Sequence, residues 1–344
     1  TRGIEVLEAA HPVPDEAGLA AGARLLDLVS GLTENDLLIA LVCGGGSALL
    51  PAPPEGLTLA DEIAVNEALL ASGAPISAMN MVRKHVSRIK GGRLAAATHA
   101  RVVSLLVSDI PGDNPAAIAS GPTIPDASTR ADALAIVAQY RLDLPAAVMT
   151  HLNGPAADAP MPDDPVFARH EHHIVASARV SLEAAADEAR GRGVMPVILS
   201  DAMEGEARDV ALVHAAIARE VLARGRPFSR PAVLLSGGET TVTLRGRGGR
   251  GGRNGEFALA MALAIDGHAI EVLAADTDGI DGSEDNAGAF ADGTTVRRLR
   301  AAGIDPREML DRNDSYTAFS TIGDFHVTGP TGTNVNDFRA ILIR

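Results

Sequence analysis

Turns rich in glycine and acidic residues follow several apolar runs of the sequence, and such turns could bind anions and metal ions. Four of them are Cys43–Ser47, Ser108–Asp113, Ser236–Thr240 and Asp276–Gly282. Glycines let backbone N–H groups approach phosphate oxygens, and ligands of open α/β sheets bind beyond the carboxyl ends of strands. The residues predicted to bind phosphate or nucleotide are Gly44, Gly45, Gly46, Ser47, Gly237, Gly238 and Glu239. For each turn taken alone, a tight chain reversal is the alternative.

The most acidic of these turns could hold a metal ion. It places Asp276, Asp278 and Asp281 two and three residues apart. Mg²⁺ keeps several waters and bridges nucleotide phosphates, so it needs few protein carboxylates. The spacing suits a magnesium ion bound at this turn, and Asp276 and Asp278 are the candidate ligands. An Asx-type turn that caps the next element is the alternative.

Two basic clusters interrupt a chain whose net charge is −14. The first contains Arg83, Lys84 and Lys90 and lies on a predicted helix that ends at a Gly-Gly pair. The second alternates with glycines and consists of Arg245, Arg247, Arg250 and Arg253. Guanidinium groups match phosphate and carboxylate geometry, and lysine supplies a compact charge. We therefore expect Arg83, Lys84 and Lys90 to hold anions, and a solvated helix face is the alternative.

The composition excludes several classes of protein. Hydrophobic residues make up 46% and charged residues 22%, as in soluble globular proteins, and the net charge opposes binding to nucleic acid or to anionic membranes. Cys43 is the single cysteine, which excludes an internal disulfide and fits a reducing cytoplasm. No apolar run reaches the length of about 18 that a membrane span needs. There is no P-loop motif, and the GxGxxG match at Gly246–Gly251 is weakened by its two interior arginines.

Short apolar strands alternate with helical patterns, which is typical of α/β proteins with largely parallel sheets. The predicted strands are 4–7, 37–43, 101–107, 173–176, 194–199, 232–236 and 270–274. Predicted helices begin after Asp15 and Thr58 and run through 181–190, 206–224 and 255–265. The 344 residues suffice for two domains, and the proline-containing break at 224–231 separates them. The proline-rich segment 140–167 is predicted to be a surface connection.

Seven segments, taken together, resemble the class II glycerate kinases, which are glycerate 2-kinases with a C-terminal MOFRL domain. The segments are Gly44–Ser47, Val82–His85 with Ile89–Leu94, Ile118–Thr123, Ser236–Thr240, Gly248–Asn254, Thr277–Gly282 and Thr328–Val335. The resemblance implies a Rossmann-like three-layer N-terminal domain, residues 1–226, and a smaller α/β C-terminal domain, residues 227–344, with the active cleft between them. Members of the family usually carry a further N-terminal segment with a Gly-Lys motif, so we expect this sequence to begin inside a longer protein.

The resemblance also implies the chemistry, which is ATP-dependent phosphorylation of D-glycerate at its 2-hydroxyl with Mg²⁺. Arg253 would stabilise the transition state, and Asp278 would bind the metal or orient the hydroxyl. Asp109 is a further candidate for a base or a metal ligand. Members are often named hydroxypyruvate reductase, so reduction of hydroxypyruvate by NAD(P)H is the alternative, and a noncatalytic nucleotide or sugar-phosphate sensor is a third hypothesis. We expect a cytoplasmic enzyme with a small-molecule substrate, and the sequence leaves a homodimer open.

Overall fold

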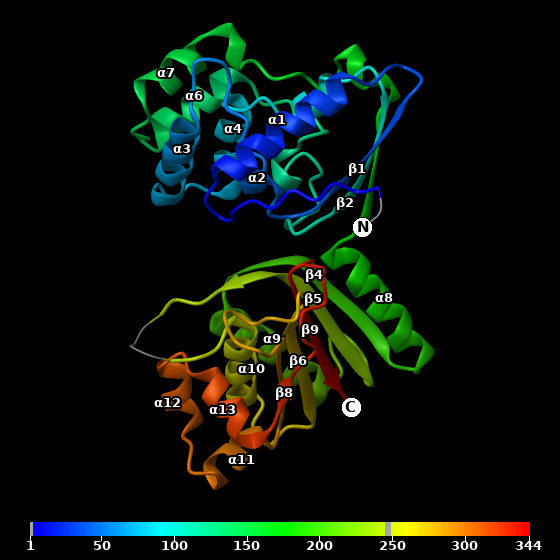
Figure 1. Ribbon diagram of the computed structural model, residues 1–344. Coiled ribbons are helices and arrows are strands. Elements are labelled where there is room, and N and C mark those ends of the chain that lie inside the picture. Colours follow the sequence, from blue (N-terminus) through cyan, green and yellow to red (C-terminus); the bar gives the residue numbers. More distant parts are fainter. Residues whose placement is uncertain (1–2, 245–248) are drawn as a thin grey trace. The chain divides into compact units, whose positions relative to one another are not determined.

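The computed structural model describes residues 3–244 and 249–344, which form two compact units (Figure 1). The first unit comprises Thr1–Ser108 and Asp113–Val175, and the second comprises Asp109–Gly112 and Ala176–Arg344. Helices and strands alternate along both, so the α/β class is confirmed. Arg245, Arg247 and part of the GxGxxG match lie outside the described residues.

The first unit combines helices with a three-stranded sheet of order β1-β2-β3. β1 and β2 run parallel, with Leu37 opposite Arg101 and Val42 opposite Leu106. The strands are β1 (Leu37–Val42), β2 (Arg101–Val107) and β3 (Glu171–Ala176). The helices are α1 (Glu16–Ser30), α2 (Gly46–Leu49), α3 (Leu59–Ala71), α4 (Ile76–His85), α5 (Arg93–Ala96), α6 (Arg130–Gln139) and α7 (Ala146–Asn153), with 3₁₀ turns η1 (Ile118–Ser120), η2 (Pro155–Ala157) and η3 (Pro165–Arg169).

Side-chain caps fix the starts of two helices of this unit. Asp15 accepts a hydrogen bond from the backbone N–H of Gly18 at the start of α1, and Thr58 forms a capping box with Asp61 at the start of α3. Each cap satisfies backbone donors that have no partner within the helix. Both predicted helix starts are therefore confirmed.

The expected strand at residues 4–7 is wrong. These residues form neither helix nor strand, and Ile4 and Val6 are 66% and 70% exposed. β-branched residues favour a strand only where the chain finds a partner strand and a face to bury.

The segment 140–167 is not a peripheral connection. It contains α7, whose Val148 and Leu152 are fully buried in a cluster with Val65 and Leu69 of α3. The carbonyl oxygen of Ala157 also accepts hydrogen bonds from Arg93 and lies 2.7 Å from Nδ1 of His85. Pro145 directly precedes α7, and Pro155 and Pro165 are the first residues of η2 and η3. These prolines begin short helices rather than mark a loop, because proline is tolerated at the first helical turn.

The second unit contains a six-stranded sheet of order β4-β5-β9-β6-β7-β8. Among the strands described in this sheet, only β4 and β5 pair in parallel. β9 pairs antiparallel with both β5 and β6, so the expectation of largely parallel sheets is wrong here. The strands are β4 (Met195–Glu206), β5 (Ala232–Thr241), β6 (Ile270–Asp276), β7 (Gly288–Asp292), β8 (Phe325–His326) and β9 (Asp337–Ile343). The helices are α8 (Ala178–Gly191), α9 (Ala207–Arg224), α10 (Arg253–Ala264), α11 (Thr295–Ala301), α12 (Pro306–Asp311) and α13 (Ser315–Ile322).

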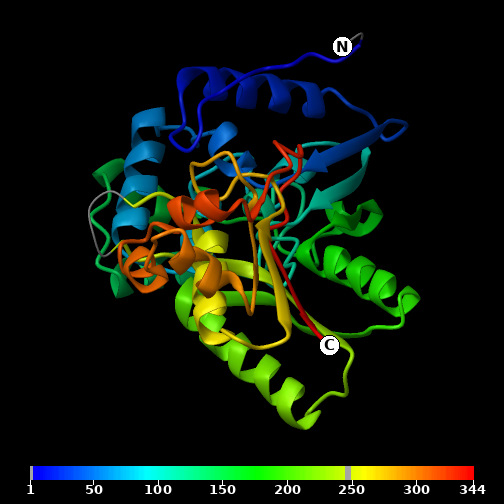
Figure 2. The same cartoon turned by 90° about the horizontal axis from the view of Figure 1, so that it is seen from below.

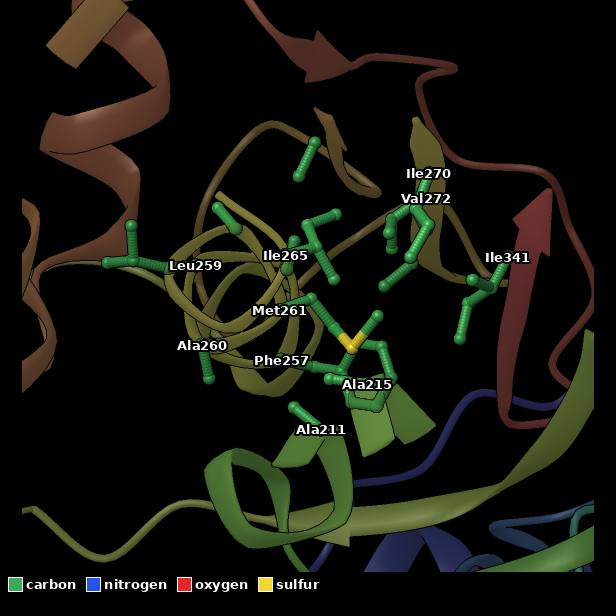
Figure 3. Close-up of a cluster of buried hydrophobic side chains, with 14 of the residues drawn as sticks. Ala211, Ala215, Phe257, Leu259, Ala260, Met261, Ile265, Ile270, Val272 and Ile341 are labelled. Carbon is green, nitrogen blue, oxygen red and sulfur yellow. The ribbon is translucent and has the colours of Figure 1, made fainter. Parts of the chain in front are cut away.

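Helices cover both faces of this sheet (Figure 1, Figure 2). Leu182 and Ala186 of α8 pack against Val233 and Leu235 of β5 on one face. The opposite face packs against α9 and α10, and Figure 3 shows Phe257 and other α10 side chains within this core. Every residue of α10 from Asn254 to Ala262 is buried. The helix that begins at Arg253 is therefore held firmly by its surroundings.

The boundary between the compact units differs from the one expected at residues 226 and 227. That position lies between α9 and β5, inside the second unit. β4 pairs with β5 from Met195–Ala232 to Glu206–Thr241, so α8, β4 and α9 belong to the same sheet layers as the C-terminal part. The proline-containing segment 224–231 thus connects α9 to β5 within the second unit.

Candidate active site

Arg253, the first residue of α10, lies among three carboxylates of the second unit. Its Nε lies 2.7 Å from Oδ1 of Asp337, its Nη2 2.5 Å from Oδ2 of Asp276, and its Nη1 2.9 Å from Oε1 of Glu239. Burial lowers the pKa of Arg253, but the charges of Asp337, Asp276 and Glu239 raise it above the usual value overall. The side chain is 24% exposed, so a fixed, permanently charged guanidinium faces solvent.

Asp337, at the start of β9, joins this arginine to its neighbours. Its carboxylate is fully buried, and Oδ1 also accepts a hydrogen bond from Nδ2 of Asn254 at 2.8 Å. Oδ2 accepts from the backbone N–H of Thr240 at 3.2 Å and from the guanidinium of Arg339. The buried carboxylate of Asp337 therefore fixes two arginines. Its ion pairs and hydrogen bonds offset the free-energy cost of burying its charge.

The start of α10 is held by Asp281. Its two carboxylate oxygens accept from the backbone N–H groups of Asn254 at 2.9 Å and Gly255 at 2.7 Å. Although these hydrogen bonds lower it, burial raises the pKa of Asp281 to about 6. A Cβ at residue 252 would lie 2.3 Å from the Asp281 carboxylate, so only glycine permits this approach. Asp281 is thus a cap that positions Arg253.

The acidic turn 276–282 closes on itself through its own carboxylates. Oδ1 of Asp276 accepts from the N–H of Asp278 at 3.3 Å, and Oδ1 of Asp278 accepts from the N–H of Ile280 at 2.8 Å. These are the Asx-type contacts that were the alternative to a metal site. Within residues 3–244 and 249–344, no group of three or more His, Cys, Asp or Glu residues is arranged to hold a metal ion.

The loop that carries the Thr328–Val335 motif supports this turn. Thr331 donates its N–H to the carbonyl oxygen of Asp278 at 3.0 Å, and Thr277 Oγ1 accepts from the N–H of Val335 at 2.9 Å. Nδ2 of Asn336 donates to the carbonyl oxygen of Asp109 at 2.9 Å. Motifs separated by more than 200 residues in the sequence therefore meet at one edge of the second unit.

The carboxylates of Asp109 and Glu239 interact electrostatically. Oδ1 of Asp109 is buried and has no hydrogen-bond partner in the described part of the chain. Burial raises the pKa of Asp109 above its usual range, and burial likewise raises the pKa of Glu239. A buried carboxylate oxygen without a donor, on a group whose pKa is raised, is suited to accept a proton from a ligand.

Gly237 and Gly238 lie within β5, between neighbouring strands and helix α8. Gly238 has φ 108°, and a Cβ there would lie 2.2 Å from the backbone nitrogen of Met203. Close packing against the irregular pairing of β4 is thus a sufficient reason for glycine at this position. Glu239, by contrast, reaches the site through its contact with Arg253.

The three basic residues expected in the first unit lie in different environments. Nζ of Lys90 is buried and lies 2.7 Å from the carboxylate of Glu62, and Nζ of Lys84 pairs with Asp126. Both ammonium groups are therefore neutralised internally and are not on a solvated helix face. Arg83 is half-buried and donates to Asn66 and Asn80 instead.

The glycine turn at Gly44–Ser47 joins β1 to α2. Gly45 has φ 78° and is the residue before α2 begins. Ser47 Oγ lies 2.9 Å from Ser120 Oγ, so the turn contacts the Ile118–Thr123 motif. Two of the resembling segments are thus adjacent in the first unit, as a shared binding surface requires.

The sequence did not indicate Asp337 and Arg339 as site residues. Both lie on β9, whose alternate residues Asp337, Arg339, Ile341 and Ile343 face inward. Charged residues at inward positions of an apolar strand were the available signal, but recognising it requires that β9 be predicted as a strand first.

Comparisons with known proteins place the chain among glycerate kinases. Residues 1–153 match a domain of unknown function, DUF4147, and residues 232–337 match the MOFRL family. A glycerate 2-kinase from Pyrococcus horikoshii is 42% identical over 97% of this chain and 76% of its own length. A D-glycerate 2-kinase from Thermotoga maritima is 41% identical over 97% of this chain and 79% of its own length. Two proteins of Agrobacterium vitis that carry a provisional hydroxypyruvate reductase name are 53% identical over 99% of this chain.

A solved structure shows the same fold. The crystal structure of glycerate kinase from Thermotoga maritima matches with a TM-score of 0.93 at 40% identity, and the match covers all of this chain and 82% of that one. No helix in the described ranges is long and apolar enough to cross a membrane. With relatives above 40% identity along nearly the whole sequence and both family models in order, the chain belongs to the glycerate kinase family whose C-terminal part is the MOFRL domain.

Proposed function

We propose that this protein is a glycerate 2-kinase, which transfers the γ-phosphoryl group of ATP to the 2-hydroxyl of D-glycerate. Membership of the glycerate kinase family supports the reaction class. The observation that carries the proposal is Arg253, a fixed guanidinium held by Asp337, Asp276 and Glu239 at the rim of the second unit. Phosphoryl transfer requires mainly such positioning and charge stabilisation.

In the proposed reaction the 2-hydroxyl oxygen forms a bond to the γ-phosphorus while the bond from that phosphorus to the bridging oxygen of ADP breaks. ADP leaves with the electron pair of the broken bond. The hydroxyl proton goes to a carboxylate, for which Asp109 is our candidate because its Oδ1 is buried without a donor in the described chain. Arg253 stabilises the charge on the phosphoryl oxygens through the N–H groups that its three carboxylates leave unused within the described residues.

Magnesium belongs to this proposal because phosphoryl transfer from ATP uses Mg²⁺ on the β and γ phosphates. Asp278 is half-buried, and its Oδ2 has no partner in the described part of the chain, so it fits an ion that takes most of its ligands from water and phosphate. Asp276 fits less well because Arg253 occupies its Oδ2. When bound, the ion would neutralise phosphate charge.

The turns Gly44–Ser47 of the first unit and Gly237–Glu239 of the second unit are each proposed to bind phosphate. For Lys84 and Lys90 the internal ion pairs favour a role in holding the fold, and of the three predicted basic residues Arg83 is the proposed anion ligand. The domain limits 1–226 and 227–344 stay a prediction; the MOFRL match begins at residue 232, near that limit. A cytoplasmic location rests on the single cysteine.

Hydroxypyruvate reduction is kept as a second candidate because two relatives carry that name. The protein is incubated with ATP, Mg²⁺ and D-glycerate, and separately with NADH or NADPH and hydroxypyruvate. We expect ADP to form only when glycerate is present, and the nicotinamide to stay reduced. Oxidation of the nicotinamide without glycerate-dependent ADP would contradict the proposal and favour the reductase.

A further inference from the structure

Arg83, in the last turn of α4, is a half-buried cation held by uncharged groups. Its Nε donates to Oδ1 of Asn66 at 2.8 Å, and its Nη1 lies 3.4 Å from Oδ1 of Asn80. Within residues 3–244 and 249–344, the guanidinium makes no ion pair, whereas the neighbouring Lys84 and Lys90 each pair with a carboxylate.

Burying a cation without a counter-charge is costly, so this arrangement needs an explanation. Burial lowers the pKa of Arg83, and the charge of Glu62 raises it. Glu62 does not itself reach the guanidinium, because its carboxylate accepts from Nζ of Lys90 at 2.7 Å and from the N–H of Ala52 at 3.1 Å. The acid whose charge acts on Arg83 therefore already pairs with another cation.

The two asparagines are themselves fixed. Nδ2 of Asn66 donates to the carbonyl oxygen of Glu62 at 3.0 Å, one turn earlier in α3. Oδ1 of Asn80 also accepts from Ser120 Oγ at 3.0 Å, and Ser120 Oγ lies 2.9 Å from Ser47 Oγ. The guanidinium is thus linked through side chains to the glycine turn Gly44–Ser47.

The backbone near Ser120 is strained as well. Ala119 and Ser120 have φ values of 50° and 62°, and both lie in the left-handed region that is unfavourable for residues with a Cβ. Such strain persists where the surrounding structure fixes a residue, and it occurs often at ligand sites. Here it places the Ser120 hydroxyl between Asn80 and Ser47.

We propose that Arg83 is the receptor for the carboxylate of the acceptor substrate, and that Asn66 and Asn80 are positioning residues that orient its guanidinium without neutralising it. The free edge of a guanidinium binds a carboxylate through two parallel hydrogen bonds. The ligand class is a small 2-hydroxy carboxylate. Its identity as D-glycerate rests on the proposed function.

The sharpest variant is Asn66→Asp. It is nearly isosteric, and it places a carboxylate at the position of an oxygen that now lies 2.8 Å from the Arg83 Nε. An internal counter-ion would compete with the substrate, so the KM for D-glycerate should rise by about tenfold or more, with kcat and the KM for ATP nearly unchanged. The matched control is Asn35→Asp, which makes the same charge change at an exposed residue of the same unit.

Arg83→Gln removes the cation, and the KM for D-glycerate should rise by about 30- to 100-fold. Arg83→Lys should restore little, because lysine lacks the two-pronged geometry. Arg24→Ala, an arginine with an exposed ion pair in the same unit, is the control. Melting temperatures of all variants separate loss of fold from loss of binding.

D-glyceramide, the uncharged amide, tests the carboxylate directly. The wild-type protein should prefer D-glycerate over D-glyceramide strongly in kcat/KM, and Asn66→Asp should remove most of that preference. A merely structural role of Arg83 would not change this ratio. The proposal would be overturned if Asn66→Asp kept the wild-type preference for D-glycerate over D-glyceramide, and if the KM for D-glycerate were unchanged in both Asn66→Asp and Arg83→Gln.

Calorimetric binding of D-glycerate separates this proposal from the proposed function. Arg83-dependent binding without ADP formation leaves the receptor standing and removes the kinase. If the protein forms ADP with D-glycerate but neither Asn66→Asp nor Arg83→Gln changes the KM for D-glycerate, the receptor proposal is wrong and the proposed kinase function stands. Failure of the wild-type protein to bind D-glycerate at all overturns both.

Discussion

Arg253 is the residue on which the proposed chemistry depends most. If it stabilises only the transition state, Arg253→Ala should lower kcat by on the order of 10²–10³ with little change in the KM for glycerate. Arg253→Lys should rescue poorly because it loses the contacts to two of the three carboxylates. Steady-state kinetics with Arg312→Ala, an exposed arginine of the same unit, as control checks this. Near-normal turnover of Arg253→Ala would refute the assignment.

Asp337 is the residue whose loss should cost the fold most. Asp337→Asn would leave Arg339, which is fully buried, without its carboxylate. Breaking a buried pair in this way costs about 3–5 kcal/mol of unfolding free energy. Denaturant titration measures it, with Glu271→Gln as control, because that glutamate forms an exposed pair worth less than about 1 kcal/mol. A loss as small as that of the control would contradict the description of Asp337 as the link between two arginines.

Asp109 sets the expected pH dependence. A base must be ionised, and burial raises the pKa of Asp109 above 3.8, so kcat/KM should fall as the pH drops through a value higher than that of an ordinary aspartate. Above the pKa of Asp109, the ionisation of this residue should no longer change kcat/KM. The pH profile of kcat/KM tests it, and Asp109→Asn should abolish the limb along with most activity. An unchanged profile in the variant would exclude Asp109 as the base.

At the residue scale the sequence indicated positions but not partners. Arg253 and Glu239 were both predicted, and the structure brings them within 2.9 Å. The sequence could not indicate two of the ion pairs, because their partners are far apart in the chain. Lys90 and Glu62 are 28 positions apart, and Arg253 and Asp337 are 84 positions apart. Spacing reveals chemistry within one turn or helix, whereas pairing across the fold depends on tertiary packing.

Helices were predicted better than strands because their signals are local. The caps at Asp15 and Thr58 are formed by residues three positions apart. β9 was missed although it lies between β5 and β6, since its stability comes from strands about 60 to 100 residues away in the sequence. The run at 4–7 has strand-like composition and no partner.

The helix α10 should be the most sensitive element of the second unit. Phe257 is fully buried, packs edge-on against His214 at 5.3 Å between ring centroids, and lies under the guanidinium of Arg339. Phe257→Ala should therefore destabilise the protein by about 3–5 kcal/mol. Denaturant unfolding checks this, and Leu212→Ala on the exposed side of α9 should cost under about 1 kcal/mol. Equal losses in the two variants would contradict the packing described.

At the scale of the whole molecule, composition and element order were enough for the α/β class and for two units. The limits of the units were not, because α8, β4 and α9 precede the break at 224–231 yet build the sheet of the second unit. Family resemblance supplied the reaction, and the MOFRL match covers 232–337, so the family model and the compact unit divide the chain differently.

The position of the transferred phosphoryl group tests the central claim most directly. The protein is incubated with ATP, Mg²⁺ and D-glycerate, and the product is identified by ³¹P and ¹H NMR. We expect 2-phosphoglycerate, formed in equal amount with ADP, because the proposed acceptor of the γ-phosphoryl group is the 2-hydroxyl of D-glycerate. Formation of 3-phosphoglycerate, or of no phosphorylated glycerate while ATP stays intact, would contradict it.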